Sequence, residues 1–297
     1  MTNTVFILGI GAHKGGTTWL AQQFKKAGVA YPLGKEAHIW DRVEAKRSAE
    51  SVGLGWLDNT KKSKHKKSRR SLAREKQNIR NKPSTYASYY KNFSKQNNID
   101  FVGDITPLYS ILSVETLGLI RSELIKEGFQ IKVFFSARDP YKRAWSSVRA
   151  GIKRRDKRRD KKKSADFALP NPSKTNYAHE LFAENYQKRA CEARTRYELI
   201  IPKLREVFME DELKICFFED VVTTNGYTDL AKFIGLTSTK AEIKTPSRVS
   251  PSIKEPDAEL KAGCINHYSA TYKYMMQSFP KSKVLWADSI KRLTNNY

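Results

Sequence analysis

Short apolar segments followed by turn residues recur along the chain and predict buried strands. They are Val5–Ile10, Ile99–Val102, Ile131–Ser136 and Leu213–Phe218. Continuous apolar runs of this length are typical of strands in a parallel sheet that is covered on both faces. Segments with helical spacing alternate with them. This pattern predicts an α/β fold with a central parallel sheet flanked by helices on both faces.

The helical spacing predicts helices between and after these strands. The predicted helices are 17–27, Leu112–Lys126, Tyr141–Ile152, Tyr177–Phe208 and Tyr227–Ile234, with Gly235 as the cap of the last. The tail after Thr237 predicts one or two more helices. Gly34–Arg42 is predicted as a loop or short strand, and the segment from Lys153 to Thr175 as a long polar loop. We expect a single domain over 1–297, with basic insertions near 44–98 and 150–176.

Positive charge is concentrated in two segments. The formal net charge is +24, and Lys61–Lys82 contributes +10 and Lys153–Lys163 contributes +7. One interpretation is that both are solvated loops. The other is that they attract a polyanionic or membrane-bound acceptor, such as a sulfated or uronic-acid polysaccharide. Charge alone also allows nucleic acid, but no motif with interleaved aromatic residues occurs, so no specific nucleic-acid partner is expected.

The three cysteines, Cys191, Cys216 and Cys264, form no recognisable pattern. Their number is odd and none lies in a CxxC pair, so neither a disulfide framework nor a zinc site is predicted. No stretch reaches the roughly 18 apolar residues that a membrane span needs. The N-terminal apolar run also lacks the preceding positive charge of a signal peptide. We therefore expect a cytoplasmic protein without a transmembrane segment.

The segment Gly9–Trp19 (GIGAHKGGTTW) has the residues that hold an anion. Glycines permit a tight turn, and the start of the next helix adds N–H donors and a partial positive charge. Lys14, Thr17 and Thr18 add further donors for a phosphate or sulfate. A plain glycine turn is the alternative. A Walker A loop would need a lysine after its last glycine, whereas Gly16 is followed by threonine, so a nucleotide kinase or NTPase is the second hypothesis.

Arg138 and Ser146 follow the third predicted strand. Arg138 comes at its carboxyl end, where ligands bind in open α/β sheets, and its guanidinium group suits a phosphate. Ser146 lies eight residues later, about two helical turns on, and so on the same side. A surface ion pair beside an unrelated helical serine is the alternative.

Together the two segments resemble the nucleotide-binding motifs of sulfotransferases that use 3′-phosphoadenosine 5′-phosphosulfate (PAPS). The first is similar to the family's phosphosulfate loop, in which a lysine and threonines hold the 5′-phosphosulfate. The positions that match this loop are Lys14, Gly15, Gly16, Thr17 and Thr18. The second segment is similar to the family's R-[DN]-P-x-x-R-x-x-S motif, which implies that Arg138 and Ser146 contact the 3′-phosphate. A looser likeness near Arg248 implies that this residue also binds the nucleotide.

The segment Gly34–Asp41 (GKEAHIWD) carries the candidates for proton transfer. On an extended segment, Glu36 and His38 share a face. The stretch resembles K-E-x-H-F-F-D of heparan-sulfate-type and related bacterial sulfotransferases. That likeness implies that Glu36 is the base, that His38 and Asp41 assist at the acceptor, and that Lys35 supports Lys14 at the sulfonate. A polar loop with a surface histidine is the alternative.

Asp104 lies in Gly103–Tyr109 (GDITPLY), which resembles the family's G-E-x-[ST]-P-x-Y segment. The likeness implies that Asp104 lines the acceptor pocket or serves as a second candidate base. In a kinase, an aspartate at a strand end would instead be a magnesium ligand.

The sequence therefore predicts a sulfotransferase with a P-loop-like fold and with PAPS as its co-substrate. Its acceptor would be a hydroxyl or amine group, on an anionic glycan or a small molecule. No metal is expected, because Lys14, Arg138 and the helix dipole can neutralise the developing charge. The sequence leaves open the acceptor and the choice of base among Glu36, His38 and Asp104. It also leaves open the kinase and a non-catalytic nucleic-acid-binding protein.

Overall fold

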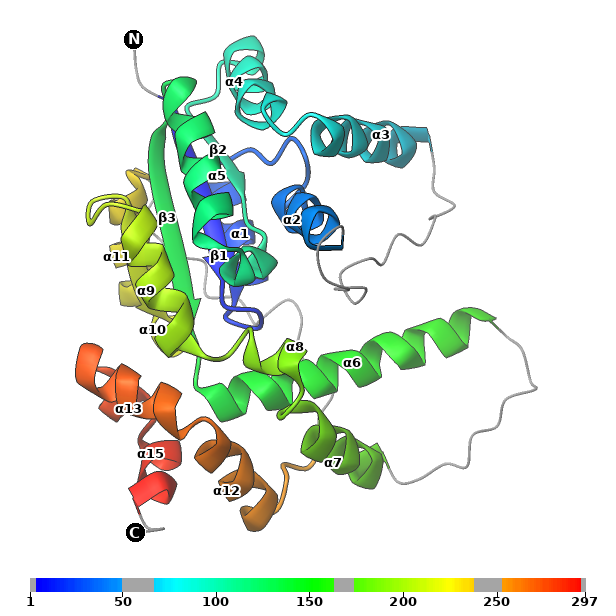
Figure 1. Cartoon of the computed structure of the whole chain (residues 1–297), viewed down its shortest axis with the longest axis vertical. Helices are drawn as coiled ribbons and strands as arrows, with labels where there is room; N and C mark the ends of the chain where they lie inside the picture. Colours follow the sequence, from blue (N-terminus) through cyan, green and yellow to red (C-terminus); the bar gives the residue numbers. More distant parts are fainter. Residues whose placement is uncertain (1–3, 50–66, 163–173, 238–252, 295–297) are drawn as a thin grey trace. The chain divides into compact units, whose positions relative to one another are not determined.

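The structure, a computed structural model, describes residues 4–49, 67–162, 174–237 and 253–294 (Figure 1). The chain divides into two compact units. The first comprises Met1–Ala137 with Ile200–Ile243, and the second comprises Arg138–Leu199 with Lys244–Tyr297. The single domain over 1–297 stays a prediction.

The first unit is built on a parallel sheet. Its described strands are β1 (Val5–Gly11), β2 (Phe101–Asp104), β3 (Gln130–Ala137) and β4 (Leu213–Phe217), in the order β2-β1-β3-β4. Every pairing is parallel, and all residues of β1 are buried. The α/β fold with a central parallel sheet is therefore confirmed, and each strand ends within two residues of its predicted position.

Helices cover both faces of this sheet. The first unit contains α1 (Thr17–Lys26), α2 (Trp40–Ala49), α3 (Lys67–Asn81), α4 (Thr85–Asn97), α5 (Val114–Lys126), α10 (Phe218–Val221) and α11 (Thr224–Ile234), with the 3-10 helix η1 (Pro107–Ile111). On one face, Ile7 of β1 shares a core cluster with Phe24 of α1 and Leu230 of α11. On the other face, the ring of Phe6 packs edge-on against Tyr90 of α4, with centroids 4.9 Å apart. Successive residues of β1 thus serve opposite layers, as the pleat requires.

The sheet has a topological switch point between β1 and β3. The chain continues from β1 to β2 on one side and from β3 to β4 on the other. Open α/β sheets bind ligands outside the carboxyl ends of the strands at such a point. Here the Ala12 N–H donates to the Ser136 carbonyl oxygen at 3.0 Å, so the loop after β1 lies against the end of β3.

The described part of the second unit is helical. It contains α6 (Pro140–Lys162), α7 (Lys174–Asn185), α8 (Arg189–Glu192), α12 (Ala258–His267), α13 (Ser269–Ser278), α14 (Ser282–Leu285) and α15 (Ala287–Thr294). Helix α9 (Tyr197–Val207) begins in this unit and ends in the first. Rings of Tyr141 and Phe182 join α6 to α7, with centroids 5.8 Å apart.

Three predictions about helices were wrong. The basic run after Ile152 continues α6 to Lys162, because lysine and arginine favour helices and no glycine or proline interrupts them. The single helix predicted over Tyr177–Phe208 is instead α7, α8 and α9. At the second break, the Thr195 hydroxyl bonds to the Cys191 carbonyl at 2.6 Å, a local contact that competes with helix continuation. The tail holds four described helices, not one or two.

None of the described helices is both long enough and apolar enough to cross a membrane.

Candidate active site

The loop between β1 and α1 has a backbone that turns sharply toward the helix. Lys14 and Gly16 adopt left-handed conformations, with φ of 73° and 77°. Gly16 is the N-cap of α1, and the first turn of the helix has no acidic residue and, among the described residues, no capping side chain. A helix N-terminus of this kind favours an anion through its unsatisfied N–H groups and its dipole.

Gly15 is required by packing. A Cβ atom at this position would lie 2.2 Å from the Ser136 carbonyl oxygen, which is closer than any tolerable contact. Gly15→Ala should therefore displace the loop, abolish binding of an anionic nucleotide and lower Tm by about 3–8 °C in calorimetry. The matched control is Gly118→Ala in α5, where nothing lies within 4 Å of the added atom and where alanine favours the helix. Normal nucleotide binding by Gly15→Ala would contradict this account of the loop.

A chain of polar contacts leads from the start of α1 to the segment 34–41. Lys35 Nζ lies 3.2 Å from Thr17 Oγ1 and 2.6 Å from Glu36 Oε1. Glu36 Oε2 lies 3.2 Å from His38 Nε2. His38 Nδ1 lies 3.0 Å from Asp41 Oδ2. The structure thus brings Lys35, Glu36, His38 and Asp41 together. Lys35 connects this group to Thr17, the first residue of α1.

These contacts determine the protonation of the two central groups. Burial opposes the ionisation of Glu36, but the hydrogen bond with His38 and the charge of Lys35 outweigh it and lower the pKa of Glu36 to about 2. Burial likewise disfavours a charged His38, but hydrogen bonds to Asp41 and Glu36 raise the pKa of His38 to about 9. At neutral pH the arrangement is a protonated imidazole ring between two carboxylates.

The stabilisation from His38 should depend on pH. Because its pKa is raised from 6.5 to about 9 on folding, the contribution is complete below about pH 6.5 and is lost as pH rises through about 9. His38→Gln should therefore lower the free energy of unfolding at about pH 6 and change it little at about pH 10, in urea titrations. Equal destabilisation at both pH values would contradict a charged His38. Glu36 has the opposite sign, and its contribution is lost as pH falls toward 2.

Asp104 is fully buried at the end of β2. Its Oδ1 atom accepts hydrogen bonds from the Ala37 N–H at 3.1 Å and the Thr106 hydroxyl at 2.6 Å. Its Oδ2 atom accepts from the hydroxyls of Tyr86 and Tyr109, at 2.8 and 2.9 Å. Burial raises the pKa of Asp104, and these donors oppose the rise. The role of Asp104 at the acceptor stays a prediction, while its four hydrogen bonds favour a scaffolding role for the neighbouring segment.

The other predicted nucleotide contacts lie elsewhere along the chain. Arg138 directly follows β3 and is half-buried, and Ser146 is buried on the second turn of α6. The Tyr197 hydroxyl donates to the Arg138 carbonyl oxygen at 2.8 Å. Arg248 lies outside the described residues. Sequence reasoning missed Lys76 and Arg80 of α3, which contact the backbone of the segment 36–38.

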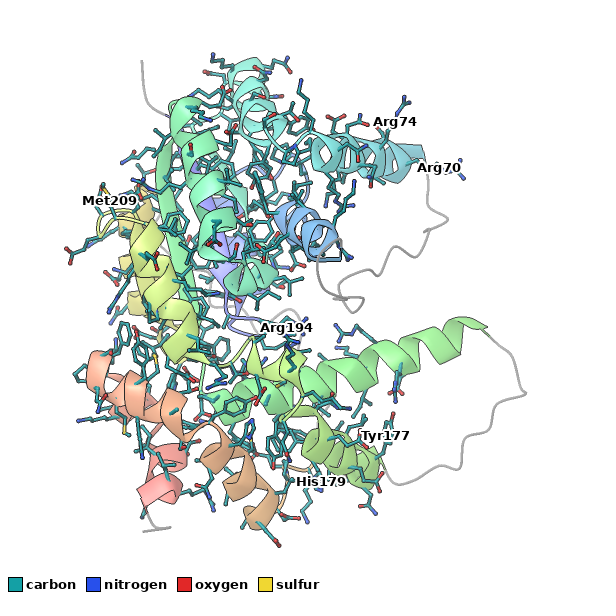
Figure 2. The ribbon with its side chains drawn as sticks, in the orientation of Figure 1. Arg70, Arg74, Tyr177, His179, Arg194 and Met209 are labelled. Carbon is teal, nitrogen blue, oxygen red and sulfur yellow. The ribbon has the colours of Figure 1, made fainter. Side chains whose placement is uncertain are left out.

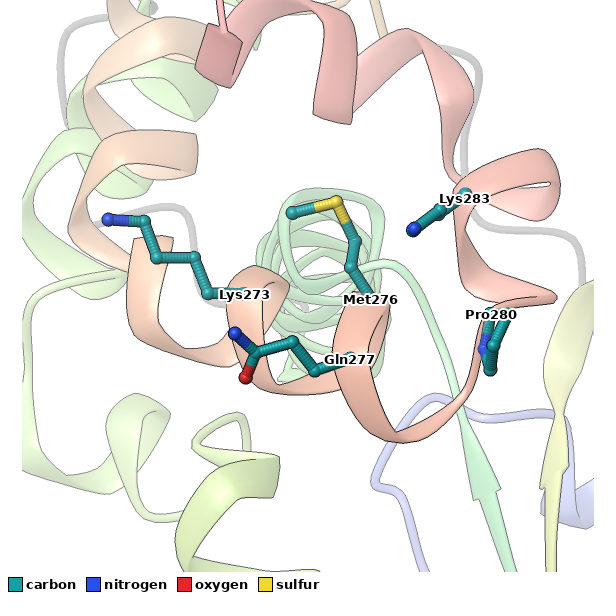
Figure 3. A pocket seen from close by; sticks show the side chains of 5 residues that line it. All are labelled: Lys273, Met276, Gln277, Pro280 and Lys283. Atoms are coloured by element: carbon teal, nitrogen blue, oxygen red, sulfur yellow. The ribbon is translucent and has the colours of Figure 1, made fainter.

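A separate hollow lies in the second unit, at α13 and α14 (Figure 3). It has a volume of about 380 Å³ and contains none of the predicted site residues. Its lining consists of Lys273, Met276, Gln277, Pro280 and Lys283.

Comparisons with known proteins establish the fold. The sequence matches no protein-family model and no curated protein. The structure is similar to the sulfotransferase from Alicyclobacillus acidocaldarius, with a TM-score of 0.51, 14% identity, and coverage of 93% of this chain and 96% of that one. The sulfotransferase domain from the Synechococcus PCC 7002 olefin synthase aligns with a TM-score of 0.44 and 16% identity, over 90% and 93% of the two chains. The first of these two comparisons shows that the chain has the P-loop-like α/β fold of a sulfotransferase.

Proposed function

We propose that this protein transfers a sulfuryl group from PAPS to a hydroxyl or amine acceptor, with Glu36 as the base. The observation that carries the proposal is the continuous chain of contacts from Thr17 through Lys35 and Glu36 to His38. It connects an anion-binding helix start to a carboxylate and a histidine. In-line sulfuryl transfer needs an anion-binding group that holds the donor and a basic group that takes the proton of the acceptor.

At the donor end, the chain's own residues suit a 5′-phosphosulfate. Lys14, Gly16, Thr17 and Thr18 surround the start of α1, which carries no competing acidic residue in its first turn. Lys35 Nζ adds a second positive charge near Thr17. PAPS supplies an activated sulfuryl group, and these cations would neutralise charge on the leaving phosphate oxygen. Arg138 and Ser146 are proposed for the 3′-phosphate that distinguishes PAPS from adenosine 5′-phosphosulfate.

At the acceptor end, Glu36 takes the proton. The acceptor oxygen or nitrogen forms a bond to sulfur as the bond from sulfur to the phosphate oxygen breaks, and the acceptor proton passes to the Glu36 carboxylate. His38 holds one carboxylate oxygen and is itself held by Asp41. Asp41 is almost completely buried, and its contact with His38 Nδ1 orients the ring; its own role at the acceptor stays a prediction.

His38 and Lys35 together lower the basicity of Glu36. The hydrogen bond with His38 and the charge of Lys35, whose Nζ atom lies 2.6 Å away, lower the pKa of Glu36 to about 2, which is low for a base. Any movement of the ammonium group toward an anion at Thr17 would weaken this contact and raise the pKa of Glu36. The carboxylate would thus become a better base when the donor is present.

Ligand-induced thermal stabilisation tests the nucleotide. 3′-Phosphoadenosine 5′-phosphate (PAP) should raise Tm, and ATP with magnesium should not, because binding to the native state alone stabilises it. A kinase would show the reverse. A nucleic-acid-binding protein would respond to neither nucleotide and would bind DNA or RNA with a steep salt dependence.

Labelled PAPS tests the reaction. A panel of uronic-acid polysaccharides, neutral sugars, phenols and amines, each incubated with [35S]PAPS, should yield at least one labelled acceptor. Binding of PAP with no labelled product across the panel and no release of labelled sulfate to water would contradict sulfuryl transfer.

A further inference from the structure

Two basic side chains of α3 hold the backbone of the segment that carries Glu36 and His38. Lys76 Nζ donates to the Glu36 carbonyl oxygen at 2.7 Å, and Arg80 Nε donates to the His38 carbonyl oxygen at 3.0 Å. The two side chains are four residues apart in α3, so they project from the same face of the helix. Both are half-buried. The helix therefore contacts alternate carbonyl groups of the segment 36–38.

The N–H groups of the same segment are held by other elements. The Ala37 N–H donates to Asp104 Oδ1 at 3.1 Å, and the Ile39 N–H donates to the Tyr109 hydroxyl at 3.1 Å. The N–H groups of Ala37 and Ile39 are thus held by residues at the end of β2 and in η1, and the carbonyl groups of Glu36 and His38 are held by α3. Removal of the α3 contacts would take these two donors away from the carbonyl groups of Glu36 and His38.

His38 needs that support. Its φ angle is 53°, in the left-handed region that residues with a Cβ atom adopt rarely. Such a conformation persists when its surroundings hold it in place. The Arg80 contact falls on the carbonyl group of this same residue.

The charges of α3 also face the carboxylates of the site. Burial lowers the pKa of Lys76, and the negative charges of Asp104 and Glu36 oppose that effect. Burial lowers the pKa of Arg80, and Asp41 opposes it. The two cations therefore contribute to the electrostatic balance of the segment as well as to its geometry.

We propose that Lys76 and Arg80 are positioning residues that hold Glu36 and His38 in the arrangement required for turnover. The inference rests on the proposed function of Glu36 as the base. It gives α3, which lies within the basic run Lys61–Lys82, a role in supporting the segment that carries Glu36 and His38.

The test compares Lys76→Met and Arg80→Met with Arg74→Met. Arg74 is exposed on the same helix (Figure 2), so its variant removes the same charge from α3 without a contact to the segment. We expect kcat, measured as release of [35S]sulfate from PAPS to water or as transfer to an acceptor from the panel, to fall about 10- to 100-fold in the first two variants. KM for PAPS should stay within about twofold. Lys76→Arg and Arg80→Lys, which keep a donor, should recover most of the activity.

Amide hydrogen exchange supplies a readout that needs no turnover. Peptides that cover residues 35–39 should exchange about tenfold faster in Lys76→Met and Arg80→Met than in the wild type and in Arg74→Met. PAP-induced thermal stabilisation verifies that each variant is folded. If Lys76→Met does not fold, Lys76→Gln takes its place in both measurements.

The possible results separate the two proposals. Wild-type exchange in both methionine variants, or fast exchange with undiminished kcat, would overturn the positioning role. Failure of Lys76→Arg and Arg80→Lys to recover activity would also overturn it. A wild-type protein that protects residues 35–39 but transfers no sulfuryl group would instead overturn the proposed function.

Discussion

Glu36→Gln should lower kcat by about 100- to 10,000-fold, the range expected when a general base is removed, while PAP still binds normally. Glutamine keeps the size of the side chain and an oxygen atom for Lys35, which lies 2.6 Å from the carboxylate. It cannot accept the proton of the acceptor. The loop at the start of α1 is not altered, so nucleotide binding has no reason to change.

Isothermal titration calorimetry measures the binding of PAP, and turnover of [35S]PAPS measures kcat. Glu115→Gln is the control, because Glu115 is exposed on α5 and its variant makes the same chemical change away from the site. The loss of negative charge should also lower the pKa of His38, which Glu36 and Asp41 now raise to about 9. Full turnover in Glu36→Gln would move the base to His38 or Asp104.

Apolar patterning predicted the first unit better than the second. Segments such as Val5–Ile10 are buried on both faces of a parallel sheet, and this burial leaves a continuous apolar run that sequence alone reveals. The extension of α6 to Lys162 could not be predicted in this way, because a helix rich in lysine and arginine has no apolar face. The breaks on either side of α8 also occur without glycine or proline.

The candidate site was predictable where its residues are neighbours in sequence. Glu36, His38 and Asp41 lie within six positions. The spacing predicted a shared face for Glu36 and His38, and the resemblance to the sulfotransferase segment implied Asp41 as their partner. The backbone is not the extended one assumed, since His38 is left-handed, yet the side chains of Glu36 and His38 meet at 3.2 Å. Lys76 and Arg80 were missed for a physical reason. A side chain that donates to a backbone carbonyl 40 or more residues away requires no particular residue there and leaves no motif.

Removal of the Arg138 side chain should selectively weaken the binding of a nucleotide that carries a 3′-phosphate. Arg138→Ala should weaken PAP binding about 10- to 100-fold, since hydrogen bonds to a charged group contribute about 1.5–3 kcal/mol each. The fold should survive the change. The Arg138 backbone is anchored through its carbonyl oxygen, which accepts from the Tyr197 hydroxyl at 2.8 Å, and alanine keeps that contact.

Adenosine 5′-phosphate, which lacks the 3′-phosphate, separates this effect from a general loss of the site. Arg138→Ala should bind it as tightly as the wild type does, so the wild-type preference for PAP should disappear in titration calorimetry. Arg138→Lys should keep part of the preference, because it retains the charge but not the paired donors of the guanidinium group. Lys142→Met, which removes one positive charge from the first turn of α6, four residues after Arg138, should keep all of it. If Arg138→Ala retains the preference for PAP, the 3′-phosphate is bound by other residues and the likeness around Arg138 does not extend to its function.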